Sequence, residues 1–243
     1  MIEQATALLG LLAETPIHAG AGQTVGVIDL PIQREAHTAW PCIYGSAVKG
    51  AMRTLAEHKE KKDNEKWVTA VFGPPPEGTS DHAGALAVGD ARLLLLPVRS
   101  LTSHFKWVTC PALLKRFIAD CQRLNIMTLS SKSNKESKDD GEVLVSQQDA
   151  KIQETLFLEE FRFKVEQTDL SEIIQALTQL MARDDAETVL HEQLAIVSND
   201  MFKHLAEHAT PVNAHTAIDN NTKTVKPGAL WYEETLPPDT LLY

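Results

Sequence analysis

A run of consecutive apolar residues in the middle of the chain most constrains its fold. The segment from Ala91 to Val98 reads ARLLLLPV, with no polar residue between Leu93 and Leu96. Apolar side chains at successive positions are typical of a strand that is buried on both faces. Any fold for this sequence must therefore cover this strand from two sides, and a chain of 243 residues is long enough to bury such a core.

The remaining segments alternate between helical and extended patterns. Apolar residues at helical spacing predict helices that start at Ser46 and span Leu113–Leu124, Leu170–Met181 and Asp200–His208. Extended patterns predict strands at Ala5–Ala13 and Phe161–Val165 and a hairpin at Ala217–Val225 with its turn at Asp219-Asn220-Asn221. This order predicts an α+β fold with a ferredoxin-like core. We find no repeat and no linker, so we expect a single domain over residues 1–243, with a mobile loop at about 130–142 where no side chain is apolar.

Charge and cysteine content exclude several classes of protein. The net charge is −10, and it is uneven, because residues 1–142 carry 16 basic and 16 acidic side chains while residues 143–243 carry 7 and 17. Nucleic-acid binders usually carry a basic excess, so a nucleic-acid function here would need a local surface and neighbouring subunits. The three cysteines lack CxxC spacing, which argues against a zinc site or disulfides. No run reaches the roughly 18 apolar residues of a membrane span, so we expect a cytoplasmic protein without a membrane partner.

A glycine-rich segment near the start of the chain carries the first candidate site residues. His18, Gly20, Gly22 and Gly26 precede Asp29, which lies between apolar residues in an extended stretch. The glycines fit neither a dinucleotide fingerprint nor a P-loop, so they form either a plain turn or an open backbone for phosphates. A histidine and an aspartate beside such a loop could activate a ribose 2′-hydroxyl, position it for attack, or help to hold a divalent ion. The spacing does not choose among these roles.

Two other groups of residues have functional and structural readings. Lys49 and Arg53 share one face of the helix that Ser46 is expected to cap, and they could contact a nucleic-acid backbone or simply be solvated. Near the C-terminus, Trp231 and Tyr232 precede Glu233 and Glu234, a pattern that by itself fits packed aromatics beside solvated acids.

Several of these segments together resemble one known family. The order is HxGxG from His18, VGVIDLPIQREAHT over residues 25–38, and GSxxKGAxR from Gly45. Later matching pieces are FGPP at 72–75, VGDA at 88–91, PVRS at 97–100 and LWYEE at 230–234. In this order they resemble the RAMP-type backbone subunit of the Cmr complex, the type III-B CRISPR effector.

The resemblance implies a fold and a mode of assembly. It implies a ferredoxin-like (RRM-like) palm with inserted fingers and a protruding β-hairpin thumb, here at about 211–228. Copies of such a subunit stack along one CRISPR RNA, bind other Cmr subunits, and kink the complementary single-stranded target RNA at regular intervals. Family members continue past the segment at 230–234 to a C-terminal glycine-rich loop, so we expect that part of the family domain to be missing from a chain that ends at Tyr243.

The resemblance also implies site residues. It assigns target-RNA cleavage to Asp29, with His18 and Glu233 or Glu234 nearby, and it implies a divalent metal, Mg²⁺ or Mn²⁺. It implies RNA contacts for a second group of residues, which comprises Gly20, Gly22, Arg34, Ser46, Lys49 and Arg53. Two alternatives remain: a purely architectural subunit that binds both RNAs without cutting, and a stand-alone endoribonuclease that trims the CRISPR precursor.

Overall fold

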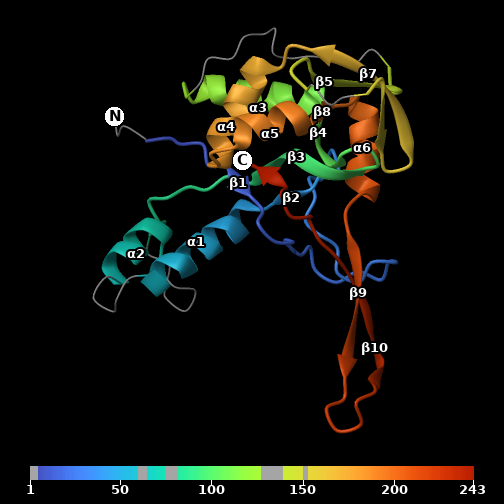
Figure 1. Cartoon of the computed structure of the whole chain (residues 1–243). Helices are drawn as coiled ribbons and strands as arrows, with labels where there is room; N and C mark the ends of the chain where they lie inside the picture. Colours follow the sequence, from blue (N-terminus) through green and yellow to red (C-terminus); the bar gives the residue numbers. More distant parts are fainter. Residues whose placement is uncertain (1–4, 60–64, 75–81, 127–138, 150–152) are drawn as a thin grey trace. The chain divides into compact units, whose positions relative to one another are not determined.

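The computed structural model describes residues 5–59, 65–74, 82–126, 139–149 and 153–243. The chain divides into two compact units (Figure 1). The sheet unit comprises Met1–Pro41 and Leu93–Tyr243, and the helical unit comprises Cys42–Arg92. Within the described ranges, no helix has both the length and the apolar character needed to cross a membrane.

A mixed β-sheet organises the sheet unit. Its strands are β1 (Leu11–Leu12), β3 (Ala91–Ser100), β4 (His104–Thr109), β5 (Glu142–Ser146), β6 (Thr155–Leu158), β7 (Phe161–Thr168), β8 (Leu194–Ile196) and β11 (Leu241–Leu242). They lie in the order β1-β11-β3-β4-β8-β5-β7-β6. The β4–β8 and β5–β7 pairs are parallel and the other pairs are antiparallel. With the helices described next, this sheet confirms the expected α+β class.

Helices pack the sheet into two core clusters. The helices of this unit are α3 (Pro111–Arg123), α4 (Ser171–Met181), α5 (Ala186–Gln193) and α6 (Asn199–His208). Residues of α3, α4 and α5 form one cluster with Leu94 and Leu95, while α6 supplies Phe202 and Leu205 to a second cluster with Leu93 and Leu96. All four leucines are fully buried. The central strand is therefore enclosed as its sequence predicted.

Helical periodicity located three of these helices correctly. The predicted helices at Leu113–Leu124, Leu170–Met181 and Asp200–His208 correspond to α3, α4 and α6. In α4 the residues at helical spacing are the buried ones, which is why the pattern was clear. The start of α6 is fixed by Ser198, whose hydroxyl accepts a hydrogen bond from the Met201 amide at 3.1 Å.

The strand predicted at Ala5–Ala13 was wrong for most of its length. Only Leu11 and Leu12 pair, with Leu242 and Leu241 of β11. Just before them the backbone at Gly10 packs against α4, because a Cβ there would lie 2.2 Å from the Leu180 carbonyl oxygen. The apolar run thus includes a close helix contact and an exposed Leu9 rather than a continuous buried strand.

A long hairpin precedes the C-terminus of the sheet unit (Figure 1). Strands β9 (Val212–Ile218) and β10 (Val225–Glu234) pair antiparallel, so the paired region extends beyond the predicted Ala217–Val225. The turn lies at the predicted place, because the Asp219 carboxylate accepts hydrogen bonds from the amides of Asn221 and Thr222 at 2.8 and 3.0 Å. The register shifts between Val225 and Leu230, beside Gly228 with its φ of 75°.

The helical unit contains β2 (Cys42–Ile43), α1 (Gly45–Lys59) and α2 (Glu65–Phe72). Strand β2 pairs with Ala91 and Arg92 at the start of β3. Ser46 does not cap α1, since the helix already begins at Gly45, whose amide donates to the Asp90 carboxylate at 2.7 Å. The predicted cap was therefore wrong, and Asp90 from a distant part of the sequence takes its role.

The two compact units bear on the expected domain plan. The sequence predicted a single domain over residues 1–243, whereas the contacts within the structure separate two compact units. That these units fold as one domain stays a prediction. Of the loop expected at 130–142, residues 130–138 lie outside the described residues, while Asp139–Gly141 form a turn and Glu142 begins β5.

The buried thiol of Cys110 is expected to make the fold less stable at alkaline pH. Burial raises the pKa of Cys110 from 9.0 to about 11, and the side chain is fully buried beside α3. Between pH 9 and 11 the unfolded chain loses this proton while the folded chain keeps it, so stability falls as pH rises, by about 2–3 kcal/mol in all. In urea titrations at pH 7 to 11, we expect Cys110→Ala to remove that part of the slope. An equal slope in both proteins would contradict the assignment.

Candidate catalytic site at the inner end of the hairpin

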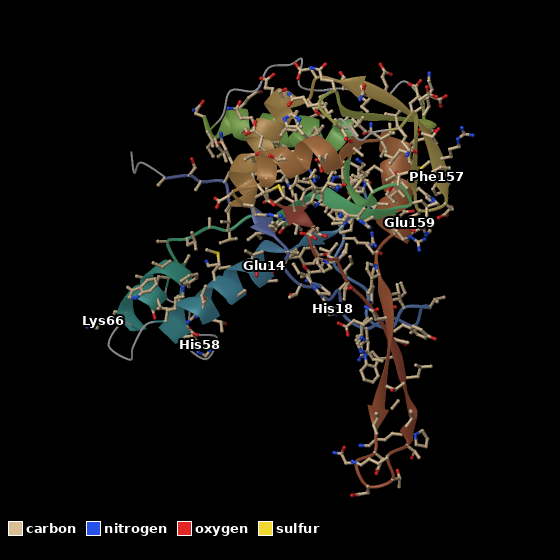
Figure 2. All side chains as sticks on the ribbon, viewed as in Figure 1. Glu14, His18, His58, Lys66, Phe157 and Glu159 are labelled. Atoms are coloured by element: carbon tan, nitrogen blue, oxygen red, sulfur yellow. The ribbon has the colours of Figure 1, made fainter. Side chains whose placement is uncertain are left out.

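The loop that carries the glycine-rich segment lies along the last residues of β10. The Leu30 amide donates to the Tyr232 carbonyl at 3.0 Å, and the Glu234 amide donates to the Leu30 carbonyl at 3.0 Å. Ile17 forms a bridge with Leu236 just beyond the strand. Figure 2 shows His18 beside this inner end of the β9–β10 hairpin. Segments about 200 residues apart in sequence thus meet here.

Asp29 is fixed by the backbone of β10. Its Oδ2 accepts a hydrogen bond from the Tyr232 amide at 2.8 Å, and the residue is partly exposed. Within the described part of the chain, no other hydrogen bond to this carboxylate is found. A carboxylate that is held by one oxygen can present the other to a ligand or a proton.

His18 is fixed with a defined tautomer. Its Nδ1 lies 2.8 Å from the carbonyl oxygen of Glu234. Because a carbonyl only accepts, Nδ1 must carry the hydrogen, and in the neutral ring Nε2 then has the lone pair. Nε2 faces Gly20, where an added Cβ would lie only 2.8 Å away. The ring is thus set up to accept a proton at Nε2, and Gly20 leaves the space for it.

Glu233 lies between two histidines. Its Oε1 is 3.7 Å from His18 Nδ1, and its Oε2 is 3.4 Å from Nε2 of His215 on β9. The Glu233 side chain is 24% exposed. His215 also stacks on Trp231, with ring centroids 5.6 Å apart and planes 17° from parallel. His215 was missed in the sequence, where nothing near it indicated a site.

Glu234 points the other way, as successive residues of a strand do. It is 3% exposed and accepts hydrogen bonds from the Ile32 amide at 3.1 Å, the Thr210 hydroxyl at 2.6 Å and the Arg34 guanidinium at 2.5 Å. Arg34 also donates to the carbonyls of Ala39 and Ala206. These contacts make the buried Glu234 and the half-buried Arg34 a brace that holds the loop against β10, and they leave Glu233 as the acid at the surface.

The glycine-rich segment forms a compact loop. Gly22 has a φ of 101°, a conformation that favours glycine, and the Ala21 amide donates to the Pro31 carbonyl at 2.9 Å. Farther along, the Thr24 amide donates to the Asp29 carbonyl at 3.1 Å. These bonds fold the segment between Gly20 and Pro31 back on itself. His18 and Asp29, which flank the glycines, therefore both lie at β10.

The donor groups of this site do not form a metal cage. Among the residues that the structure describes, no group of three or more histidine, cysteine, aspartate or glutamate side chains could hold a metal ion. Glu234 is committed to Arg34, Thr210 and Ile32, and one oxygen of Asp29 is committed to Tyr232. Mg²⁺ usually demands six oxygen ligands, so the protein alone does not fit this ion.

The remaining predicted RNA contacts lie in the helical unit. Lys49 Nζ donates to the Leu86 carbonyl at 2.7 Å, and an ammonium has two further hydrogens for another acceptor. Arg53 pairs with Glu57 at 2.8 Å and donates to the Gly73 and Pro74 carbonyls at 3.2 and 3.3 Å. Ser46 is exposed on the first turn of α1. Both cations therefore also have structural roles inside this unit.

Comparison with known proteins places the chain in a family. A model described as the RAMP superfamily matches residues 11–242. The CRISPR system Cmr endoribonuclease Cmr4 of Pyrococcus furiosus is 36% identical over 239 residues, which cover 97% of this chain and 79% of that protein. The crystal structure of oligomeric Cmr4 from Pyrococcus furiosus is 30% identical, with a TM-score of 0.72 over 96% of this chain and 77% of that one.

A second solved structure supports the fold. The cryo-EM structure of the type III-B Cmr-beta complex bound to cognate target RNA contains a chain that matches with a TM-score of 0.73 at 23% identity, over 96% of this chain and 80% of that one. At this identity the likeness concerns the fold, which agrees with the RAMP assignment. The chain therefore belongs to the RAMP superfamily and, within it, to the family of the Cmr4 subunits of CRISPR Cmr systems.

Proposed function

We propose that this chain is a repeated backbone subunit of a type III-B Cmr complex that binds guide CRISPR RNA and cleaves complementary target RNA. The observation that carries the proposal is the attachment of Asp29 and His18 to neighbouring backbone groups of one strand, the Tyr232 amide and the Glu234 carbonyl. The relative named Cmr endoribonuclease and the oligomeric form of Cmr4 support cleavage and self-association. The proposed partners are guide RNA, target RNA, further copies of this chain and other Cmr subunits.

The site suits attack by a ribose 2′-hydroxyl on the adjacent phosphate. In that reaction the 2′-oxygen forms a bond to phosphorus while the bond to the 5′-oxygen breaks, which leaves a 2′,3′-cyclic phosphate and a 5′-hydroxyl. One proton leaves the 2′-hydroxyl and one reaches the 5′-oxygen. The Asp29 carboxylate and His18 Nε2 each have a free lone pair, so either can take the 2′-hydroxyl proton as a general base, and the protonated group can then deliver that proton to the departing 5′-oxygen.

Gly20 gives a test of the His18 geometry. Substitution by alanine places a methyl group 2.8 Å from His18 Nε2, so the ring must turn and lose its bond to the Glu234 carbonyl. We expect Gly20→Ala to slow the single-turnover cleavage of target RNA that is already fully bound, on the order of 10²-fold. Gly50→Ala is the matched control, since a Cβ at Gly50 meets no atom within 4 Å. Equal rates for the two variants would contradict this role.

We also propose that cleavage requires Mg²⁺ or Mn²⁺. Because the described side chains supply no cage, such an ion would take most of its ligands from RNA phosphates and water, which Mg²⁺ accepts readily. We expect EDTA to stop cleavage by the assembled complex and added Mg²⁺ or Mn²⁺ to restore it, while guide and target stay bound. Full cleavage in EDTA would exclude the requirement.

The reaction class is tested with a modified target. The guide-loaded complex is reconstituted with this chain and given a complementary RNA, or the same RNA with a single 2′-deoxy nucleotide at one cut. We expect evenly spaced products from the first and the loss of that one product from the second, since DNA lacks the attacking group. Cleavage at the deoxy position would contradict 2′-hydroxyl attack, and no cleavage of the all-RNA target would leave the architectural alternative.

A further inference from the structure

His215 has no part in the site as the sequence predicted it, yet it contacts the site from the opposite strand. It lies on β9 directly across from Trp231 in the hairpin register, and the two rings are stacked. Stacking fixes the plane of the imidazole. In that orientation Nε2 lies 3.4 Å from Oε2 of Glu233.

The Glu233 carboxylate is thereby bracketed by two imidazoles from separate segments. One oxygen is 3.4 Å from His215 and the other is 3.7 Å from Nδ1 of His18. A glutamate side chain that is 24% exposed has several accessible rotamers. The contact of Oε2 with His215 selects the rotamer in which Oε1 faces His18. Without His215, the 3.7 Å contact with His18 would be the one side-chain contact left to Glu233 among the described residues.

The position of Glu233 matters because of the atom it faces. A carboxylate beside Nδ1 favours the tautomer that carries its hydrogen there, and this reinforces the bond from Nδ1 to the Glu234 carbonyl. The lone pair then stays on Nε2, where the proposed chemistry needs it. An orienting acid of this kind acts on an imidazole without touching the reacting atoms.

We propose that His215 is a positioning residue for RNA cleavage. It holds Glu233 in the rotamer that orients His18, and Trp231 holds His215 in turn. This inference rests on the proposed function of the same site. It concerns the rate of the chemical step and not the binding of target RNA.

The test separates stacking from the contact with Glu233. His215→Phe keeps a flat ring against Trp231 but has no N–H group, whereas His215→Gln keeps an N–H donor near the position of Nε2. Single-turnover cleavage and target affinity are measured in the guide-loaded complex. We expect His215→Phe to cut about tenfold more slowly with unchanged affinity, which is a normal size for coupled neighbours, and His215→Gln to retain most of the rate. Thr216→Val, at the next position of β9, controls for damage to the hairpin.

A double-mutant cycle shows whether His215 acts through Glu233. Once Glu233→Gln is present, we expect His215→Phe to slow cleavage no further. The proposal would be overturned if the rate losses of His215→Phe and Glu233→Gln multiplied in the double variant. It would also be overturned if His215→Gln lost as much activity as His215→Phe. If native complexes cut and need Asp29 but His215→Phe cuts at the native rate, only this inference fails. If native complexes do not cut, the proposed function itself fails.

A second readout does not depend on activity or assembly. Nitrogen-15 NMR of histidine rings in the full chain distinguishes the two neutral tautomers of His18. We expect the form with hydrogen on Nδ1 in the native chain and in His215→Gln, and a larger share of the other form in His215→Phe, where the Glu234 carbonyl is left to favour hydrogen on Nδ1 without the Glu233 carboxylate. An unchanged His18 tautomer in His215→Phe would overturn the proposal even if that variant failed to assemble.

Discussion

Replacing Asp29 with asparagine is expected to slow target cleavage by about 10²–10⁴-fold, the usual contribution of a general acid or base. The amide oxygen of asparagine can still accept the hydrogen bond from the Tyr232 amide, which is 2.8 Å long in the native chain, so the loop should keep its place. The substitution removes only the charge and the ability to take a proton. Single-turnover rates in the guide-loaded complex measure the loss, and the affinity for target RNA should not change.

Two further variants make the Asp29 result specific. Asp29→Ala also removes the acceptor for the Tyr232 amide, so it should cut no faster than Asp29→Asn. Asp185→Asn removes one negative charge from the start of α5, where Asp185 pairs with Arg183 at 3.0 Å outside the site, and it should cut at the native rate. Native cleavage by Asp29→Asn would show that this carboxylate takes no part in the chemistry.

Replacing Glu234 with alanine is expected to lower the free energy of unfolding by about 3 kcal/mol, the low end for removing one partner of a buried ion pair, because Arg34 is 22% exposed and keeps two carbonyl acceptors. The carboxylate is 3% exposed, and its loss leaves the Arg34 guanidinium, the Ile32 amide and the Thr210 hydroxyl without their shared acceptor. Urea unfolding of the full chain at neutral pH measures the change.

The adjacent glutamate is the natural comparison. Glu233 is 24% exposed, and across the described ranges its carboxylate pairs with two histidines and no other ionised side chain, so Glu233→Ala should cost less than about 1 kcal/mol. If Glu233 orients His18, Glu233→Ala should lower the rate of target cleavage although it leaves the free energy of unfolding nearly unchanged. Equal losses of stability in the two variants would contradict the division of roles between brace and surface acid.

The parts of the fold that sequence could predict are those in which local pattern and tertiary burial agree. The apolar spacing in α4 matches its buried face, and the four leucines of β3 are all enclosed. Prediction failed where a distant group decided the outcome. The run that contains Leu9 is not a strand because Gly10 packs on Leu180, and α1 starts at Gly45 because of Asp90.

The site shows the same limit more sharply. Spacing could mark His18 and Asp29 as candidates, and the family resemblance added Glu233 and Glu234, but only the fold shows that Glu234 is buried. Counting back from the pair of Ile218 with Val225 would place His215 opposite Gly228. The register shift after Val225 places it opposite Trp231 instead. No sequence rule supplies that shift, and this is why His215 was missed.

The central claim is that each copy of this chain cuts RNA with its own Asp29. The most direct test uses complexes that contain both native and Asp29→Ala copies. Guide-loaded complexes are reconstituted from native and Asp29→Ala chains in known ratios, and the evenly spaced products are quantified under single-turnover conditions. The account predicts that cleavage at each position falls in proportion to the fraction of native chains and disappears when every copy carries Asp29→Ala. A full set of products from complexes that contain only Asp29→Ala would contradict it and assign the cutting to another subunit.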